Sequence, residues 1–389
     1  MKIAIVPSTP FWEDHFGRLA LSESDLADGI YRGTWITSYA RSLTASGHEV
    51  TLLVPSRVRA SRVEGVLMTV ALVKAQRWAA IVPRRCSRGP LRDIVSLLSS
   101  FCLFEELRRH DLIYVQEYNT GRFALLSRKL GRRKLPPMIA AHHGGSIERT
   151  YKWVMAVADY PACSLFTTLT ERELRSLHKL TSVEERKIRL LSNPVDDRWF
   201  KLDGSPDART ILWMGRMEDR AKNLSFLLDM VENVVAGGVE VRLLLAGGGG
   251  DADAIRDRVN QSPTLRKSVE MHGRLDSVSD LLQVAKKASI LVLPSRVEGF
   301  PLVVAEMLCG GRGLLLSRLP YVDSELQGLA GVSVFEQGDL PGATAALERA
   351  VTEGLSPDES TVLWARARFS PESFHSDLAA IVVEAAAVD

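Results

Sequence analysis

Cysteine is scarce in this 389-residue sequence. The four cysteines, Cys86, Cys102, Cys163 and Cys309, show neither CxxC nor His-Cys spacing. Small disulfide-stabilised folds and structural zinc sites depend on clustered cysteines, so this scarcity argues against both. We predict reduced thiols that are mostly packed in the interior.

Long apolar runs are missing as well. Hydrophobic residues make up 46% and charged residues 25% of the chain, which is average for a globular protein. No apolar run approaches the roughly 20 residues that span a bilayer, so we expect no integral membrane protein. Residues 1–6 form a strand-like run without the basic, apolar and small-residue succession of a signal peptide. We therefore expect a cytoplasmic location.

Two common nucleotide-binding signatures are also absent. The first predicted strand is not followed by GxGxxG, and the four glycines at 247–250 lack the Lys-Ser/Thr of a P-loop. In dinucleotide-binding enzymes and NTPases these residues hold the phosphates. The sequence therefore supports neither a dinucleotide dehydrogenase nor a P-loop NTPase.

The sequence does contain a steady alternation of apolar runs and amphipathic segments, which is typical of parallel sheets covered by helices. A chain of this length is too long for one core and suits two α/β domains with a cleft between them. The predicted strands are 2–6, 49–54, 111–116, 137–141, 164–168, 210–214, 240–246, 268–272, 289–293 and 313–317. The predicted helices are 34–46, 93–109, 120–130, 171–180, 223–236, 276–287 and 301–309.

Two stretches lack periodicity. Residues 193–200 and 203–207 are rich in turn residues and form the predicted hinge between the domains. Residues 10–33 are predicted to be a long loop over the carboxyl ends of the strands, where open α/β sheets bind ligands. We interpret this loop as a lid over the part of the cleft where an acceptor substrate would bind. The alternative is an insertion without function.

The net charge of +2 conceals an asymmetry between the two halves. Residues 1–196 hold 29 Lys and Arg against 19 Asp and Glu, a net +10, whereas the remainder holds 20 against 28, a net −8. The first half is therefore expected to meet something acidic, such as a phosphorylated acceptor, an anionic membrane surface or a nucleic acid. The alternative is an ordinary solvated face.

A basic cluster follows one predicted strand of the second half, in the sequence from Met214 to Asn223. Arg216 and Lys222 lie at a strand-to-helix turn, so they can converge above the strand ends. Arginine offers a planar fork to phosphate oxygens and lysine a mobile point charge. The pair can therefore neutralise a departing nucleoside diphosphate, although such a pair taken alone is more often simply solvated.

An acidic cluster follows another predicted strand. Pro301 suits the first turn of a helix, so the free amides of residues 302 to 304 can face a phosphate. Glu298 lies at the loop rim near sugar hydroxyls, and Glu306 lies within an apolar run, where it can grip a ribose diol. A carboxylate in such surroundings requires a partner.

These clusters resemble the retaining GT-B glycosyltransferases of family GT4. The resemblance covers nearly the whole chain and rests on the glutamates separated by seven residues, the Gly-Arg…Lys segment, Gly47-His-Glu-Val and Asn193-Pro-Val-Asp. It implies two Rossmann-like domains facing across a deep cleft, with the acceptor bound by residues 1–196 and the donor by 205–370. A C-terminal helix at about 372–389 is expected to pack back on the first domain.

The resemblance also implies roles for individual residues. Arg216 and Lys222 would contact the donor diphosphate, Glu298 the sugar and Glu306 the ribose. His143 is the expected catalytic histidine, with His142 the less favoured neighbour. The predicted catalytic residues are His143, Arg216, Lys222 and Glu298, and the predicted donor-binding residues are Gly33, Arg216, Lys222, Arg274, Leu275, Glu298, Gly299, Phe300, Pro301, Leu302, Val303 and Glu306.

Gly33 stands where the family has a pair of glycines, and only one is present, so this loop is expected to bind differently. Asp251-Ala-Asp253 imitates the metal-binding DxD of the other major glycosyltransferase fold, but it follows glycines at a predicted helix start, where Asp is a good cap. We therefore expect no catalytic metal and no cofactor beyond the nucleotide sugar.

The resemblance thus implies a retaining hexosyltransferase that moves a sugar, UDP-linked by default, to an acceptor hydroxyl in envelope polysaccharide, glycolipid or natural-product biosynthesis. The alternatives are a nucleotide-sugar epimerase or hydrolase on the same fold, and a sugar-binding protein without catalysis. No nucleic-acid-binding module accompanies the basic half.

One further stretch concerns the acceptor. Residues 57–92 carry nine basic residues against the single acid Glu64, with Trp78 and Ile81-Val82 interleaved. Such a stretch can rest on anionic lipid headgroups while the cleft glycosylates a lipid-linked acceptor. An exposed basic loop, or a soluble acceptor, is the alternative.

Overall fold

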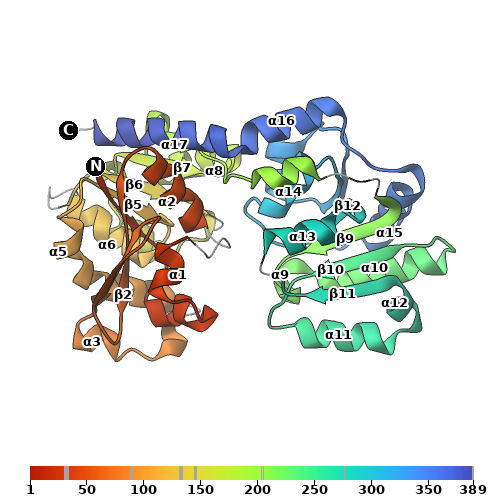
Figure 1. The fold of residues 1–389 in the computed structure, drawn as a ribbon, viewed down its shortest axis with the longest axis horizontal. Coiled ribbons are helices and arrows are strands. Elements are labelled where there is room, and N and C mark those ends of the chain that lie inside the picture. Colours follow the sequence, from red (N-terminus) through yellow and green to blue (C-terminus); the bar gives the residue numbers. More distant parts are fainter. Residues whose placement is uncertain are drawn as a thin grey trace. The chain divides into compact units, whose positions relative to one another are not determined.

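The computed structural model describes residues 1–29, 35–87, 91–130, 135–143, 147–202, 204, 206–275 and 277–387. The chain divides into two compact units, unit 1 (Met1–Ser192 with Phe374–Asp389) and unit 2 (Asn193–Ser373). Each unit has its own largely parallel sheet with helices packed on it (Figure 1). The predicted α/β fold class is therefore confirmed.

The sheet of unit 1 has the strand order β3-β4-β2-β1-β5-β6-β7-β8, in which β3 and β4 are antiparallel and the other pairs are parallel. Its strands are buried apolar runs, as the sequence predicts for parallel strands covered on both faces. They are β1 (Lys2–Val6), β2 (Glu49–Ser56), β3 (Ser61–Glu64), β4 (Thr69–Lys74), β5 (Leu112–Gln116), β6 (Met138–Ala141), β7 (Leu165–Thr168) and β8 (Ile188–Leu190).

The helices of unit 1 connect these strands and cover the sheet. They are α1 (Glu23–Ala27), α2 (Trp35–Ala45), α3 (Arg77–Ala80), α4 (Arg92–Ser99), α5 (Phe104–Leu107), α6 (Gly121–Leu130), α7 (Lys152–Val157), α8 (Glu171–Thr181) and α17 (Pro371–Ala386). Although α17 comes last in the chain, its buried residues Leu378, Ile381 and Val382 join the same apolar cluster as Ile3 and Ile5 of β1. The end of the chain is therefore part of the core of unit 1.

The sheet of unit 2 is parallel throughout and has the order β11-β10-β9-β12-β13-β14. Its strands are β9 (Asp207–Met214), β10 (Arg242–Ala246), β11 (Val269–Gly273), β12 (Ala288–Leu293), β13 (Gly313–Ser317) and β14 (Val332–Phe335). Its helices are α9 (Asp219–Lys222), α10 (Leu224–Ala236), α11 (Ala252–Gln261), α12 (Pro263–Ser268), α13 (Val278–Ala285), α14 (Leu302–Cys309), α15 (Leu340–Glu353) and α16 (Glu359–Phe369). One apolar cluster holds this unit together.

Residues 10–29 do not form the long irregular loop that was predicted for residues 10–33. This stretch contains the 3-10 helices η1 (Trp12–Asp14) and η2 (Phe16–Leu19) as well as α1, and it buries Phe11, Trp12 and Phe16 in unit 1. The turns are too short to produce a periodic pattern, yet their aromatic side chains anchor them. The rest of the stretch, including Gly33, lies outside the described residues.

The predicted helix at 93–109 is interrupted. The chain forms α4, then a 3-10 turn, η5 (Ser100–Leu103), and then α5. The hydroxyls of Ser99 and Ser100 donate to the carbonyl of Ser96, at 3.0 and 2.6 Å. Serine hydroxyls that bond nearby carbonyls compete with regular helical bonding, which accounts for the change at this point.

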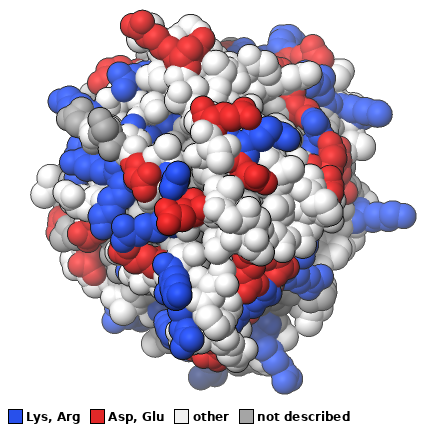
Figure 2. All heavy atoms as spheres, turned by 90° about the vertical axis from the view of Figure 1, so that its right-hand side faces the viewer, with Lys and Arg blue, Asp and Glu red and all other residues white. Residues whose placement is uncertain are grey.

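Charged side chains of unit 2 are mixed in sign. On the face that Figure 2 turns toward the viewer, basic and acidic side chains are interspersed. Arg258 contacts both Asp229 and Glu232, and Arg318 contacts Asp323 and Glu336. The acidic excess of the second half of the chain therefore does not form a single negatively charged patch on this face. Among the described helices, none has the length and apolar character of a membrane span.

Candidate functional site

The order of strands in unit 2 places two turns side by side. β9 pairs with β10 on one side and with β12 on the other. After β9 the chain adds β10 and β11 on one side and then continues with β12 on the opposite side, so the order of strands reverses between β9 and β12. Ligands of open α/β sheets bind at the carboxyl ends of the strands at such a reversal. The turns after β9 and β12 are the two that the sequence singled out.

The turn after β9 is fixed by its own side chains. α9 ends at Lys222, and Asn223 adopts a left-handed conformation (φ 56°) from which α10 begins. The carboxylate of Asp219 accepts hydrogen bonds from the amide and the hydroxyl of Ser225, at 2.8 and 2.7 Å. Lys222 therefore stands at a defined position between two helices.

The four glycines after β10 support this turn. The amide of Met217 donates to the carbonyl of Gly248 at 2.9 Å, and the amide of Gly215 donates to that of Ala246 at 3.0 Å. A Cβ atom on Gly247 would lie 1.8 Å from the carbonyl oxygen of Gly215, so only glycine permits this close approach. The glycines thus serve backbone packing and do not form a phosphate loop.

Asp251 caps a different helix from the one predicted. It occupies the position before α11, but its side chain accepts a hydrogen bond from the amide of Asp219 at 2.7 Å and thereby caps α9. In the described part of the chain, no three His, Cys, Asp or Glu side chains are grouped to hold a metal ion. Metal-independent catalysis stays a prediction.

The turn after β12 carries Glu298, whose carboxylate is held by two donors. Lys222 Nζ lies 2.5 Å and Ser295 Oγ 2.8 Å from Glu298 Oε1, and the Lys222 and Glu298 side chains are only 20% and 10% exposed. The amide of Arg296 donates to the carbonyl of Ala221 at 2.8 Å, and its guanidinium bonds the carbonyl of Asp219. These bonds join the two predicted clusters.

Both turns open on a pocket of about 300 Å³. Its lining consists of side chains from the two turns, from α14 and from neighbouring apolar positions. They are Trp213, Met214, Gly215, Lys222, Leu281, Leu293, Glu298, Pro301, Leu302, Val303 and Glu306. Six of the predicted donor-binding residues, Lys222, Glu298, Pro301, Leu302, Val303 and Glu306, are thus brought together.

Other predicted residues do not line this pocket. Arg216 follows Gly215 but is 69% exposed on its side chain, and it contacts Glu218 at 3.2 Å. Arg274, Leu275, Gly299 and Phe300 are absent from the lining as well. Phe300 packs on the ring of Phe369, at 5.4 Å between centroids, so it holds the loop beside Glu298 in place. The convergence of Arg216 with Lys222 is not seen in this side-chain arrangement.

The N-terminus of α14 presents two amides to the pocket. Pro301 precedes the helix, and among the described residues no acceptor bonds the amides of Leu302 and Val303. The prediction of a third free amide is wrong, because the amide of Val304 donates to the carbonyl of Pro301 at 3.0 Å and tightens the first turn. Two N–H groups at a helix N-terminus attract an anion.

Glu306 lies one turn further along α14 and is half-buried. No described side chain donates a hydrogen bond to it. Burial, with a smaller contribution from the nearby Asp196 carboxylate, raises the pKa of Glu306 to about 8. A carboxyl group that retains its proton near neutral pH in a pocket wall is a marker of a binding site.

His142 and His143 follow β6 in unit 1, with different surroundings. The ring of His143 stacks on Trp35, at 4.2 Å between centroids, and meets Tyr39 edge-on. His142 is 3% exposed and its Nε2 lies 3.8 Å from Glu173. His142 therefore belongs to the interior of unit 1, and the ring nitrogens of His143 are buried as well, so the catalytic role of His143 stays a prediction.

Sequence reasoning missed Glu117, at the end of β5 beside these histidines. Its backbone is left-handed (φ 63°), which is uncommon for a residue with a side chain. Its Oε1 accepts a hydrogen bond from the amide of His143 at 3.2 Å, and Oε2 is buried with no hydrogen-bond partner among the described residues. Burial raises the pKa of the carboxyl group. A strained backbone at a residue whose buried carboxylate oxygen lacks a hydrogen-bond partner often marks a functional position. No motif in the sequence around Glu117 predicts this conformation.

Comparison with known proteins agrees with this geometry. The family model "Glycosyltransferase Family 4" matches residues 33–199, and "Glycosyl transferases group 1" matches residues 208–353. Together these matches cover most of both halves of the chain. Residues 33–199 and 208–353 are therefore assigned to glycosyltransferase domains of these two families.

Individual relatives point the same way. Phosphatidyl-myo-inositol mannosyltransferase of Mycobacterium tuberculosis is 30% identical over 121 residues, which is 31% of each chain, so the matched part spans about a third of that relative. The structure resembles Anabaena HepE in complex with UDP (TM-score 0.67, 13% identity, 98% of this chain and 100% of that one). It also resembles sucrose-phosphate synthase of Thermosynechococcus elongatus (TM-score 0.71, 14% identity, 100% of both chains). These likenesses establish a fold of the GT-B type.

Proposed function

We propose that this protein transfers a sugar from a nucleoside-diphosphate sugar to an acceptor hydroxyl with retention of anomeric configuration. The observation that carries the proposal is the contact between Lys222 and Glu298 in a pocket that also receives the free amides of α14. A cation and two N–H groups match the charge of a diphosphate. UDP is the favoured nucleotide, because a solved structure of the same fold is a complex with UDP.

Donor binding would exchange partners within the pocket. The ammonium group of Lys222 is compensated by Glu298 in the structure. A diphosphate at the N-terminus of α14 would offer Lys222 a second anion, and Glu298 would then turn part of its hydrogen-bonding capacity to sugar hydroxyls. As the bond to the sugar breaks, Lys222 and the two amides stabilise the negative charge on the departing phosphate. Arg216 reaches the diphosphate by turning away from Glu218.

Retention is proposed to occur by displacement on the face from which the phosphate leaves. The alternative with a covalent intermediate needs a carboxylate that is free to attack the anomeric carbon. Glu298 is the carboxylate nearest the expected sugar position, but Lys222 and Ser295 already bond its Oε1. Isolation of a glycosyl adduct on Glu298 would overturn this part of the proposal.

The acceptor side is assigned to unit 1. We propose that residues 1–196 bind the acceptor, that 205–370 bind the donor, and that His143 helps to orient the transferred sugar. The acceptor is proposed to be acidic or lipid-linked, because the first half of the chain carries a net charge of +10. We propose that the protein acts in the cytoplasm, peripherally at the inner face of the cytoplasmic membrane, in envelope polysaccharide, glycolipid or natural-product biosynthesis.

Glu306 makes donor affinity depend on pH. Ribose hydroxyls donate to a carboxylate, so nucleotide binding favours the ionised form and releases a proton while the pH is below about 8. Affinity for UDP is therefore expected to rise about tenfold between pH 7 and pH 9, in proportion to the ionised fraction of Glu306 in the free protein. Calorimetry in two buffers with different ionisation enthalpies measures the proton release directly.

The matched control is Glu306→Gln, which keeps the shape and removes the titration. Its affinity is expected to lose this pH dependence, whereas any titration of the diphosphate itself is common to both proteins. An unchanged pH profile in Glu306→Gln would remove Glu306 from the donor site.

Turnover assays test the proposed function. The purified protein is incubated with labelled UDP-sugars, with and without a panel of acceptors that includes membrane lipid extracts. Transfer to an acceptor supports the proposal. Conversion of the donor without an acceptor would indicate an epimerase or a hydrolase, and a donor that binds but stays intact under all conditions would indicate a binding protein.

A further inference from the structure

Helix α4 and the turn that follows it bury Val95 and Leu103, but they also bury three serines and leave two large apolar side chains exposed. Ser96, Ser99 and Ser100 are fully buried, whereas Ile94 is 43% and Phe101 is 38% exposed. A surface helix of a globular protein normally turns its apolar residues inward and its polar residues outward. The two exposed apolar side chains make the outer face of α4 a candidate contact surface.

The buried serines have a reason of their own. Arg122 lies fully buried beneath α4, and its guanidinium donates to Ser100 Oγ at 2.8 Å, to Ser99 Oγ at 3.1 Å and to the carbonyl of Pro10. A buried guanidinium needs such acceptors. This network explains why serines face inward, but it does not require apolar residues on the outside.

The exposed apolar residues continue onto the neighbouring segment. Trp78 of α3 is 48% exposed and its ring meets that of Phe101 at 5.8 Å, while Ile81 is 78% and Leu91 48% exposed. Exposed apolar side chains that stand singly need no explanation, but a contiguous group marks an interaction surface. We call this group, Trp78, Ile81, Leu91, Ile94 and Phe101, the α3–α4 face.

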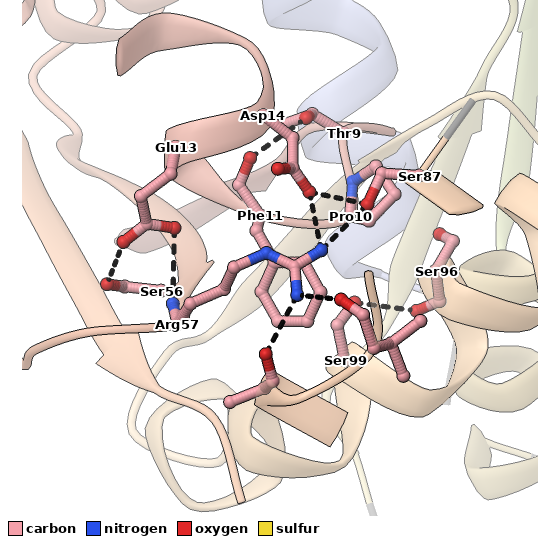
Figure 3. A network of polar contacts seen from close by, with 12 residues as sticks. Thr9, Pro10, Phe11, Glu13, Asp14, Ser56, Arg57, Ser87, Ser96 and Ser99 are labelled. Atoms are coloured by element: carbon pink, nitrogen blue, oxygen red, sulfur yellow. Dashed lines mark hydrogen bonds and ion pairs between the residues drawn. The ribbon is translucent and has the colours of Figure 1, made fainter. Parts of the chain in front are cut away.

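A buried network holds part of the face in position (Figure 3). The guanidinium of Arg57 lies over the ring of Phe11 at 3.9 Å and pairs with Asp14 at 2.9 Å. It also donates to the carbonyls of Ala80 and Val82, at 2.9 and 2.5 Å, the two residues that flank Ile81 in the chain. Ile81 is therefore held outward by the fold.

Arg57 also corrects the interpretation of the basic stretch 57–92. Its side chain is only 8% exposed, so it belongs to the interior and not to a lipid-facing loop. Arg59 pairs with Glu23 at 2.6 Å. Among the basic residues that stay open to an external anion, Arg77, Arg84 and Arg85 lie further along the chain, in the segment of the α3–α4 face.

The charge of the segment that precedes α4 is of one sign. Residues 65–92 contain no Asp or Glu. Arg77, Arg84 and Arg85 are exposed, and no carboxylate of the described residues pairs with them. Apolar side chains that can enter a headgroup layer, bordered by unpaired arginines, are complementary to an anionic bilayer surface. A partner protein would need an acidic rim around an apolar pocket to match the same features.

We propose that the α3–α4 face docks onto anionic lipid, with Trp78 and Ile81 entering the headgroup boundary and Arg84 and Arg85 meeting lipid phosphates. The proposal rests on the proposed function only in that a lipid-linked acceptor would give the docking its purpose. Docking through this face would bring unit 1, the part assigned to the acceptor, to the membrane surface.

Vesicle co-sedimentation of the full chain tests the proposal, using phosphatidylcholine vesicles with and without phosphatidylglycerol. The wild type is expected to sediment with the anionic vesicles and not with the neutral ones. Arg84→Ala/Arg85→Ala should weaken binding about tenfold or more, since each basic residue near an anionic surface contributes about fivefold. Trp78→Ala/Ile81→Ala should also lose most binding, including the part that resists high salt.

Val66→Ala/Leu180→Ala is the matched control, because it removes two exposed apolar side chains of unit 1 outside the face, 89% and 45% exposed. It should bind as the wild type does. Failure of the wild type to bind anionic vesicles would overturn the proposal, and so would normal binding by Trp78→Ala/Ile81→Ala. Stabilisation by UDP is measured on the same samples and reports separately on the proposed function, because it depends on unit 2.

Discussion

Lys222→Ala is expected to lower the rate of sugar transfer by about a hundredfold or more while the fold stays intact, because removal of one preorganised stabiliser of transition-state charge has effects of this size. Lys222 lines the pocket, is largely buried and contacts Glu298 at 2.5 Å. Its loss removes the cation from the diphosphate and frees Glu298 from the partner that orients it. Steady-state turnover with saturating donor measures the effect.

The same helix supplies the control. Arg220 is exposed and lies two residues before Lys222 in α9. Arg220→Ala removes a comparable charge and should retain nearly full turnover. Arg216→Ala is also expected to lose most of the sugar-transfer activity. In the wild type the Arg216 side chain has to move from its present position before it can contact the diphosphate. Turnover at the wild-type rate in Lys222→Ala would refute its assignment.

Gly247→Ala is expected to destabilise unit 2 by about 3 kcal/mol, at the upper end of the effect of forcing an atom into a packed site. Its Cβ would lie 1.8 Å from the carbonyl oxygen of Gly215, and its φ of 153° is one that residues with side chains rarely adopt. The backbone would have to separate the turns after β9 and β10. Urea unfolding followed by circular dichroism measures the loss.

Gly250 offers a comparison within the same run of glycines. A Cβ atom there meets nothing within 4 Å. Gly250→Ala should therefore change the free energy of unfolding by no more than about 0.5 kcal/mol. If the two variants were equally stable, the account of the turn as a close-packed support for Lys222 would be wrong.

The sequence predicts much of the fold, because parallel strands buried on both faces appear as apolar runs. Its errors have local causes. The hairpin of β3 and β4 was not predicted, because β3 alternates between half-buried and exposed residues in a basic stretch, without an apolar run. The single helix predicted at 93–109 is interrupted, because serine hydroxyls and Arg122 change the bonding at Ser99 and Ser100.

The candidate site was predicted less evenly. Glu298 and Lys222 lie 76 residues apart in the chain, yet their turns were expected to meet, because both follow buried strands. The outward position of Arg216 could not be foreseen, since a side chain at a turn has several directions open to it. Glu117 was missed because its strained backbone results from tertiary structure and not from a local sequence pattern.

The pocket between the turns after β9 and β12 is proposed to bind the diphosphate of a nucleotide sugar. Thermal unfolding with UDP and with uridine, for the wild type and for Lys222→Ala, measures this binding, since a ligand stabilises the state to which it binds. We expect UDP to stabilise the wild type well beyond uridine, and this difference to be much smaller in Lys222→Ala, which keeps only the amides of α14 and Arg216. An equal advantage of UDP over uridine in both proteins would contradict the claim.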